Sequence, residues 1–354
     1  RQRLFTYQWE IDLNTSPNAP TPGARIRLSG LLATIATGLF LTVSLGACAT
    51  DMPAETPAVS PANAFITLGT NGGPVAEIGH SQPANALQVG KDIYLVDAGD
   101  GAAGQLVKAG FKLQQVRAVF LSHLHFDHTG GVLAVLGSRM QTNTQSLLTI
   151  YGPPGTREFV ESLLAGMAPI MKAAYGMPQQ EWQSNVEVNE LVDGSVVELK
   201  GVKVTVAENS HFAIPESANV PEKAKSLSLR FDLPDRSIVY TGDTGPSENV
   251  EELAKDADLL VSEMMDIPVV LSRAREYLPN APEQAFINME WHFRAHHLTP
   301  VQVGELAAAA GVKAVVITHQ APKIATDDHK KKILDGVSSK FDGSVVLAND
   351  LDRY

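Results

Sequence analysis

The residues best suited to chemistry in this chain form one run, Ser122-His123-Leu124-His125-Phe126-Asp127-His128-Thr129-Gly130-Gly131. Three imidazoles and one carboxylate fall within six consecutive positions of it. Imidazole and carboxylate groups are the usual ligands of zinc and related divalent ions. The run therefore predicts a metal site, and the alternative interpretation is a solvated histidine-rich loop.

Apolar segments that read as strands must position these side chains. Val116–Leu121 is a predicted buried strand, and its end delivers the run onto a single loop. Three further polar residues follow other predicted strands: His211 after a strand ending at Ala207, Asp243 after Ile238–Tyr240, and His319 after Ala314–Ile317. Side chains that follow several neighbouring strand ends can converge on one metal centre at a sheet edge.

The rest of the folded part alternates between strands and helices, twice over. The predicted strands of the first half are 65–68, 87–89, 93–96 and 147–151, with helices from Leu106, from Val132 and over 155–180. In the second half the predicted strands are 196–199, 202–207, 227–231, 238–240 and 314–317, with helices near 247–255, 300–310 and 327–335. This pattern indicates two β-sheets sandwiched by helices.

Composition excludes some classes of protein. The 354 residues carry 28 Lys and Arg against 39 Asp and Glu, a formal net charge of -11. Because so acidic a surface repels phosphate backbones, nucleic acid is an unlikely partner. The single cysteine, Cys48, excludes an internal disulfide framework.

The amino-terminal part resembles an export signal. Residues 1–24 are interpreted as an N-terminal extension, and 25–48 combine basic residues, an apolar stretch and the small-residue sequence Leu45-Gly46-Ala47-Cys48. This ending resembles the lipobox of bacterial lipoproteins, which implies a lipidated Cys48, export, and a periplasmic or cell-surface location on a membrane. A transmembrane anchor and a buried helix are the alternatives. Residues 49–61 read as a flexible tether, and 62–354 as the hydrolase domain.

Taken together, these motifs resemble the metallo-β-lactamase superfamily and, within it, the ribonuclease Z and arylsulfatase-like branch. The resemblance covers about residues 64–350 and rests on the histidine-rich run together with 68–74, 96–101, 151–155, 241–244, 297–299 and 318–319. It implies a four-layer αββα sandwich.

The resemblance also implies ligands for two Zn²⁺ ions, with Mn²⁺ or Fe²⁺ as alternatives. His123, His125 and His211 would hold the first ion, and Asp127, His128 and His319 the second, with Asp243 bridging both. Asp127 would also orient or deprotonate the attacking water.

A second catalytic residue follows from the same resemblance. His297 matches a histidine that protonates the leaving group, and Thr299 and Pro300 after it fit the start of a helix. His292 and His296 compete for this assignment, but only His297 has the family's spacing to Leu298 and Thr299.

The expected activity is hydrolysis of a small anionic ester, an aryl sulfate or a phosphodiester, by a metal-bridging hydroxide. Alternatives are a lactone or thioester hydrolase, a ribonuclease Z-like phosphodiesterase, and a metal-stabilised lipoprotein that only binds a ligand. Phe126 replaces a glycine of ribonuclease Z, and no tRNA-gripping arm is visible between 155 and 200. The oligomeric state is left open, and a homodimer is compatible with the sequence.

Overall fold

Two β-sheets lie face to face in the computed structural model, which describes residues 63–173, 182–214, 224–322, 324 and 326–354. The signal peptide, Cys48 and the tether all precede residue 63, so they lie outside the described residues and stay predictions. Among the described helices, none is both long and apolar enough to cross a membrane.

The first sheet has six strands in chain order. Strands β1 to β3 pair antiparallel, and β3 to β6 pair parallel. The strands are β1 (Asn63–Gly69), β2 (Ala84–Val89), β3 (Asp92–Ala98), β4 (Val116–Phe120), β5 (Leu148–Gly152) and β6 (Val186–Glu190).

The second sheet has seven strands in the order β13-β12-β11-β10-β9-β8-β7. Strands β7 to β10 pair antiparallel, and β10 to β13 pair parallel. They are β7 (Val196–Leu199), β8 (Val202–Glu208), β9 (Leu227–Asp232), β10 (Ser237–Tyr240), β11 (Leu259–Met265), β12 (Ala314–Ala321) and β13 (Ser344–Leu347).

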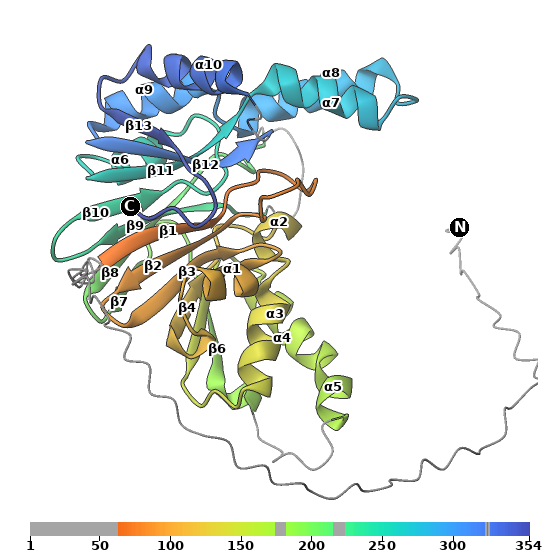
Figure 1. Ribbon diagram of the computed structural model, residues 1–354, viewed down its shortest axis with the longest axis vertical. Coiled ribbons are helices and arrows are strands. Elements are labelled where there is room, and N and C mark those ends of the chain that lie inside the picture. The colour runs from red at the N-terminus through yellow and green to blue at the C-terminus, as the bar shows by residue number, and fades with distance from the viewer. Residues whose placement is uncertain (1–62, 174–181, 215–223, 323, 325) are drawn as a thin grey trace, which may run out of the picture. The chain divides into compact units, whose positions relative to one another are not determined.

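Helices cover the outer face of each sheet, which makes the four-layer αββα sandwich predicted from the sequence (Figure 1). The helices that follow strands of the first sheet are α1 (Ala102–Lys108), α2 (Phe126–Thr129), α3 (Val132–Gln141), α4 (Thr156–Gly166) and α5 (Ala168–Lys172). Those in the second half are α6 (Glu248–Leu253), α7 (Ile267–Tyr277), α8 (Glu283–His296), α9 (Pro300–Ala310) and α10 (Asp327–Ser338).

Apolar side chains on both faces of the central strands explain why the layers form. In β3, Ile93 and Leu95 join the core beneath α1 and α3, whereas Tyr94 and Val96 join the core between the sheets. Successive side chains of a strand point to opposite faces, so a continuous apolar run buries both. The second sheet packs in the same way against α6, α9 and α10.

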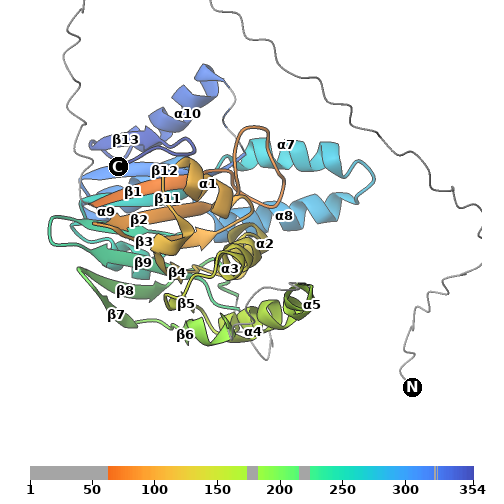
Figure 2. The same ribbon diagram turned by 60° about the horizontal axis from the view of Figure 1, so that its bottom comes forward.

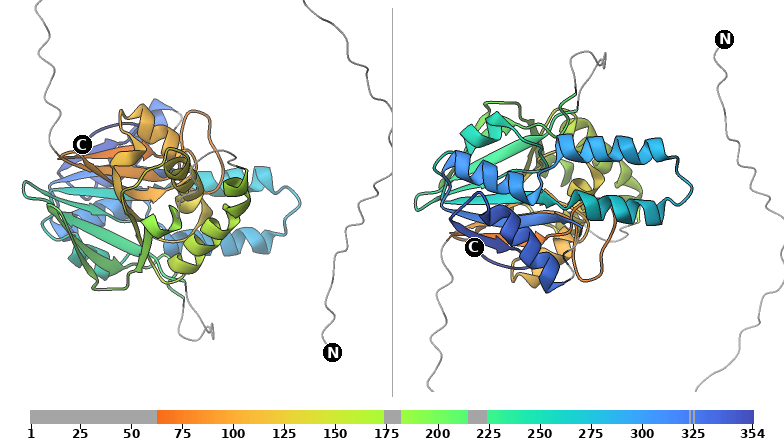
Figure 3. Two further views of the ribbon diagram at one scale, coloured as in Figure 1. Left: turned by 90° about the horizontal axis from the view of Figure 1, so that it is seen from below. Right: turned by 90° about the horizontal axis from the view of Figure 1, so that it is seen from above.

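Helices α7 and α8 form a hairpin that the sequence did not predict. The hairpin projects from the sandwich (Figure 3) and leaves it on the side where α2 lies (Figure 2). Arg275 holds its two helices together, because its guanidinium binds both carboxylate oxygens of Glu283 at 2.7 Å and lies 4.3 Å from the ring centre of Phe286.

One local prediction was wrong. His319 was placed after a strand, but β12 continues to Ala321, and an irregular register opposite Ser262–Met264 accompanies a φ of 39° at His319. Such a bulge redirects a side chain without ending the strand. On α10, Nε2 of His329 lies 3.1 Å from the buried carboxylate of Asp266.

Candidate metal centre

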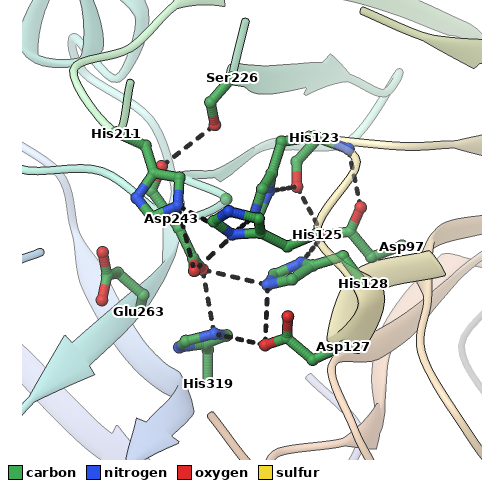
Figure 4. Close-up of polar contacts among 12 residues, drawn as sticks. Asp97, His123, His125, Asp127, His128, His211, Ser226, Asp243, Glu263 and His319 are labelled. Atoms are coloured by element: carbon green, nitrogen blue, oxygen red, sulfur yellow. Dashed lines mark hydrogen bonds and ion pairs between the residues drawn. The ribbon is translucent and has the colours of Figure 1, made fainter. Parts of the chain in front are cut away.

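The predicted ligands lie at one edge of the sandwich, where strands of both sheets end (Figure 4). Three of them follow strand ends: His123 after β4, His211 after β8 and Asp243 after β10. The short helix α2 carries Asp127 and His128, with His125 immediately before it, and β12 carries His319. The structure therefore brings together all seven side chains that the sequence singled out.

Close backbone packing fixes the histidine-rich run against β3. A side chain on Gly99 would come within 2.0 Å of the Asp127 carbonyl oxygen, and one on Gly131 within 2.2 Å of the Gly99 carbonyl oxygen. Only glycine allows such an approach. The glycines of Asp97-Ala98-Gly99 and Thr129-Gly130-Gly131 thus hold α2 at a fixed depth in the site.

Group one consists of His123, His125, His211 and Asp243, whose potential ligand atoms all lie within 4.8 Å of one another. Nδ1 of His125 is 3.0 Å from Nε2 of His123 and 3.2 Å from Nε2 of His211. Neighbouring donors around a tetrahedral zinc ion lie about 3.3 Å apart, given Zn–N bonds near 2.0–2.1 Å. The three imidazoles are spaced as such donors are.

Group two consists of Asp127, His128 and His319. Oδ2 of Asp127 lies 3.6 Å from Nε2 of both histidines. Asp243 faces both groups: its Oδ1 is 3.3 Å from His128 and 3.1 Å from His319, while its Oδ2 is 3.9 Å from His123 and His211. With one oxygen of Asp243 counted in each group, both groups have four donors.

Several of these atoms are buried without a well-aligned hydrogen-bond partner. They are Nε2 of His128, both ring nitrogens of His319 and Oδ1 of Asp243. Buried polar groups without partners are rare in folded proteins, and bound ions are one explanation of them. A divalent cation in group two would satisfy three of these four atoms, so the residues there fit the metal that the sequence implied.

The remaining ring nitrogens of three histidines are held by acceptors, which fixes their tautomers. Nδ1 of His128 donates to Oδ2 of Asp97 at 2.7 Å, and Nδ1 of His211 donates to the His296 carbonyl at 3.0 Å. Ser122 gives its hydroxyl proton to Asp97, so its oxygen accepts from Nδ1 of His123 at 3.0 Å. When these rings are neutral, each Nε2 therefore presents a lone pair to the centre, as metal-ligating histidines do.

Asp97 is a residue whose role the sequence analysis missed, although it stands in one of the motifs quoted. Its carboxylate also accepts from the Ser122 backbone and from the Tyr240 hydroxyl, both at 2.7 Å. Its φ of 57° is unusual for a residue other than glycine, and aspartate is among those that tolerate it. Asp97 thus positions the candidate ligand His128 and, through Ser122, His123, and it also binds Tyr240 of the second sheet.

The two groups differ in charge. Burial lowers the pKa of His211 to about 3 and lowers those of His123 and His125. Burial acts in the same direction on His128 and His319, but Asp243, Asp127 and, for His128, Asp97 outweigh it. The pKa of His319 rises to about 10, and that of His128 rises well above its usual value.

The two aspartates show the reciprocal effect. Burial would raise the pKa of Asp127, yet His128 and His319 lower it to about 2. The same two histidines hold the pKa of Asp243 well below its usual range. Both carboxylates are therefore charged at neutral pH, as a metal ligand must be.

His297 lies beside both groups and is held by a buried carboxylate. Its Nδ1 is 3.0 Å from Oε2 of Glu263, which stands in β11, and Oε1 of Glu263 accepts from the Thr244 backbone at 2.7 Å. Burial lowers the pKa of His297, but Glu263 reverses this and raises it. Glu263 lies in an apolar strand that the sequence analysis did not identify, so its role was missed.

The geometry favours His297 over His296 for contact with a substrate, whereas His292 lines the same cavity as His297. A cavity of about 310 Å³ is lined by His297 together with His125, Asp127, Asp243 and His319. The ring of His296 is turned elsewhere, toward the Ala213 carbonyl at 2.8 Å and His292 at 2.8 Å. The helix after His297 begins as predicted, with Thr299 as N-cap and Pro300 in its first turn.

Comparison with known proteins places the chain among hydrolases of one superfamily. A family model described as a β-lactamase superfamily domain matches residues 92–320. A ribonuclease Z of Mycobacterium sp. (strain KMS) is 30% identical over 291 residues, covering 81% of this chain and 94% of the relative. One from Mycobacterium marinum is 28% identical over 298 residues, covering 81% and 97%.

Solved structures share the fold at lower identity. The metallo-β-lactamase fold protein YhfI from Bacillus subtilis superimposes with a TM-score of 0.57 at 19% identity, covering 82% of this chain and 98% of that one. The short form of human tRNase Z gives a TM-score of 0.56, also at 19% identity and with the same coverage. These two similarities concern the fold alone.

Proposed function

The chain belongs to the metallo-β-lactamase superfamily, a family of metal-dependent hydrolases, and we propose that it hydrolyses anionic esters, phosphodiesters first among them, with two divalent ions. One observation carries the proposal. Asp243 directs one carboxylate oxygen at each of two groups of imidazole and carboxylate donors, and its Oδ1 is buried without a hydrogen-bond partner, as are Nε2 of His128 and Nε2 of His319. A site that only stabilised the fold would need one closed group of four donors.

Zinc is the proposed ion, because three imidazoles and a carboxylate suit it, with Mn²⁺ or Fe²⁺ as alternatives. When bound, two such ions supply Lewis acidity and lower the pKa of water toward neutrality. The residues around them orient what the ions activate. Asp127, at 6% exposure, reaches the cavity and can hold a water molecule by its carboxylate or accept its proton.

His297 is proposed to protonate the leaving group. Its Nδ1 donates to Glu263, so Nε2 is the nitrogen free to face the cavity. Glu263 raises the pKa of His297, which keeps a proton available near neutral pH. A histidine so placed can give its proton to the departing oxygen and receive charge stabilisation from Glu263.

The candidate activities differ in the group that is attached to the ester. Relatives named ribonuclease Z favour cleavage of RNA by this chain as a second candidate. The net charge of -11 disfavours a nucleic acid substrate. A small phosphodiester or aryl sulfate is compatible with both the donor groups and the net charge of the chain. Hydrolysis of a lactone or thioester would require the same two ions.

The test is a comparison of substrates on the zinc-loaded protein. We expect hydrolysis of bis(4-nitrophenyl) phosphate, lost on chelation and restored by zinc. Parallel assays use 4-nitrophenyl sulfate, an acyl lactone and a precursor tRNA. Replacing His329, which binds Asp266 away from the centre, should leave the rates unchanged. Two bound ions without hydrolysis of any of these substrates would refute an enzymatic role and favour a ligand-binding one.

A further inference from the structure

The cavity at the metal centre is lined by two unlike sets of side chains. One set is polar and includes His297 with four candidate ligands, His125, Asp127, Asp243 and His319. The other consists of apolar side chains, mainly Met265, Val270, Ala274, Tyr277 and Phe293, and we name these five residues the hairpin wall. Four of the five come from α7 and α8 or the loops beside them, and Met265 ends β11. The unpredicted hairpin thus builds a surface of the site.

Helical geometry places the α7 residues of this wall on one face. Val270, Ala274 and Tyr277 follow one another at spacings of four and three, which brings their side chains above one another on a helix. Phe293 on α8 packs with Val270 against the apolar cluster of Met265, Ile267 and Ala321. The hairpin wall is therefore packed against the sandwich through Val270 and Phe293.

The charged groups near the wall cancel each other. Outside the candidate ligands and the histidines, the described cavity residues include one acid and one base, Glu77 and Arg273. Nη1 of Arg273 lies 2.5 Å from Oε1 of Glu77, so the two form an ion pair. None of the described lining residues offers an unpaired cation to a second phosphate.

We propose that the substrate has one reacting anionic ester and, attached to it, an uncharged apolar group about the size of one ring that lies on the hairpin wall. The reacting end rests on the proposed function; the apolar end rests on the wall. A cavity of about 310 Å³ lies at the lower end of the range for small-molecule sites. A polynucleotide would instead need unpaired basic side chains along the cavity for its successive phosphates.

Binding of product-like monoesters tests the proposal independently of turnover. Calorimetry on the zinc-loaded protein compares methyl phosphate, phenyl phosphate and uridine 5′-monophosphate. Burial of a ring against the wall should make phenyl phosphate bind about tenfold to hundredfold more tightly than methyl phosphate. Uridine 5′-monophosphate should bind more weakly than phenyl phosphate, because its polar base and ribose find no partners on the wall.

Variants locate the preference. Val270→Ser and Tyr277→Ser should reduce the ratio of the phenyl to the methyl affinity at least threefold while leaving the methyl affinity unchanged. Tyr277 is 65% exposed, so its replacement does not threaten folding. Ile287→Ser is the matched control, since Ile287 is exposed on α8 and does not line the cavity. It should keep the ratio of the parent.

The outcomes separate this inference from the proposed function. Equal affinities for methyl and phenyl phosphate, a ratio untouched by both wall variants, or tightest binding of uridine 5′-monophosphate would overturn the inference even if nitrophenyl phosphodiesters are hydrolysed. A phenyl preference that is lost in the wall variants, in a protein that hydrolyses no ester, would support the wall and overturn the proposed function alone.

Discussion

The two donor groups share Asp243 but are built from opposite kinds of surroundings. Group one has three histidines, and the two whose second nitrogen is bonded use neutral oxygens, the Ser122 hydroxyl and the His296 carbonyl. Group two has its own carboxylate, Asp127, and Nδ1 of His128 donates a hydrogen bond to a second carboxylate, Asp97. The histidines of group one are accordingly uncharged at neutral pH, whereas the raised pKa values of His128 and His319 favour an extra proton on each ring of group two.

This difference shows how a protein can give two sites of similar geometry different affinities for protons and for metal ions. Carboxylates near an imidazole strengthen it as a ligand, but they also make it hold a proton more tightly. Group two therefore gains basicity and must release protons before a cation enters. Group one competes less with protons and has no carboxylate of its own.

The largest effect is expected from Asp243→Ala, which removes the one side chain shared by both groups. Loss of an outer partner costs about 10–100-fold in metal affinity or activity, and loss of this direct contact should cost more. We expect elemental analysis to find fewer than two metal equivalents and hydrolysis to be lost. Asp235→Ala, on the exposed turn between β9 and β10, is the control. Two retained equivalents in Asp243→Ala would refute the bridge.

His297→Ala should leave both groups filled while slowing the reaction about 10²–10⁴-fold on an alkyl phosphodiester. The effect should be much smaller on a nitrophenyl ester, whose leaving group departs without a proton. The measurement is kcat for both esters in the variant and in the parent. His296→Ala is the comparison, because that ring is turned away from the cavity. Equal losses on the two esters would assign His297 a binding role only.

The groups should respond differently to pH. The pKa values of His128 and His319 are raised, so both hold protons at neutral pH, and a cation in group two must displace them. Two displaced protons make the apparent affinity rise about a hundredfold per pH unit while both remain bound. Group one, whose histidine pKa values are lowered, should load almost independently of pH between 6 and 8. The measurement is calorimetric titration with zinc at several pH values. The same dependence of affinity on pH for both metal equivalents would contradict the prediction.

The smallest effects are expected from the outer partners. Asp97→Asn should weaken metal binding about 10–100-fold, and more in group two, because His128 loses a charged acceptor. Ser122→Ala removes a neutral acceptor from His123, so its effect should be smaller and confined to group one. Competition with a chromophoric chelator measures both. A larger loss of metal affinity in Ser122→Ala than in Asp97→Asn would show that group one, and not group two, depends more on its outer partner.

Much of the site could be predicted because its signals are local. His123, His125, Asp127 and His128 fall within one loop and one turn of helix, so their spacing alone brings them together. The start of α9 is equally local, since Thr299 and Gln302 form a capping box within four residues. The apolar runs of β3 and β4 likewise predicted strands, and that of β4 a buried one.

Other features could not be read in this way. Asp97 meets the Tyr240 hydroxyl across 143 residues, and His297 meets Glu263 across 34. Neither pair has a sequence signal, because each depends on how elements that are distant along the chain come together in the fold. The α7–α8 hairpin was missed as well, because it lies partly in solvent and the apolar face that α7 turns to the cavity consists of only Val270, Ala274 and Tyr277.

The sequence by itself determined the candidate ligands, most of the strands that position them and the two sheets sandwiched by helices, because these follow from short-range spacing and from the periodicity of apolar residues. Only the tertiary structure decided which carboxylate serves which histidine and what surrounds the substrate. The physical reason is that a pKa and a cavity wall depend on all neighbours within a few ångströms. Most of those neighbours, such as Asp97, Glu263 and Phe293, are distant along the chain from the groups they act on.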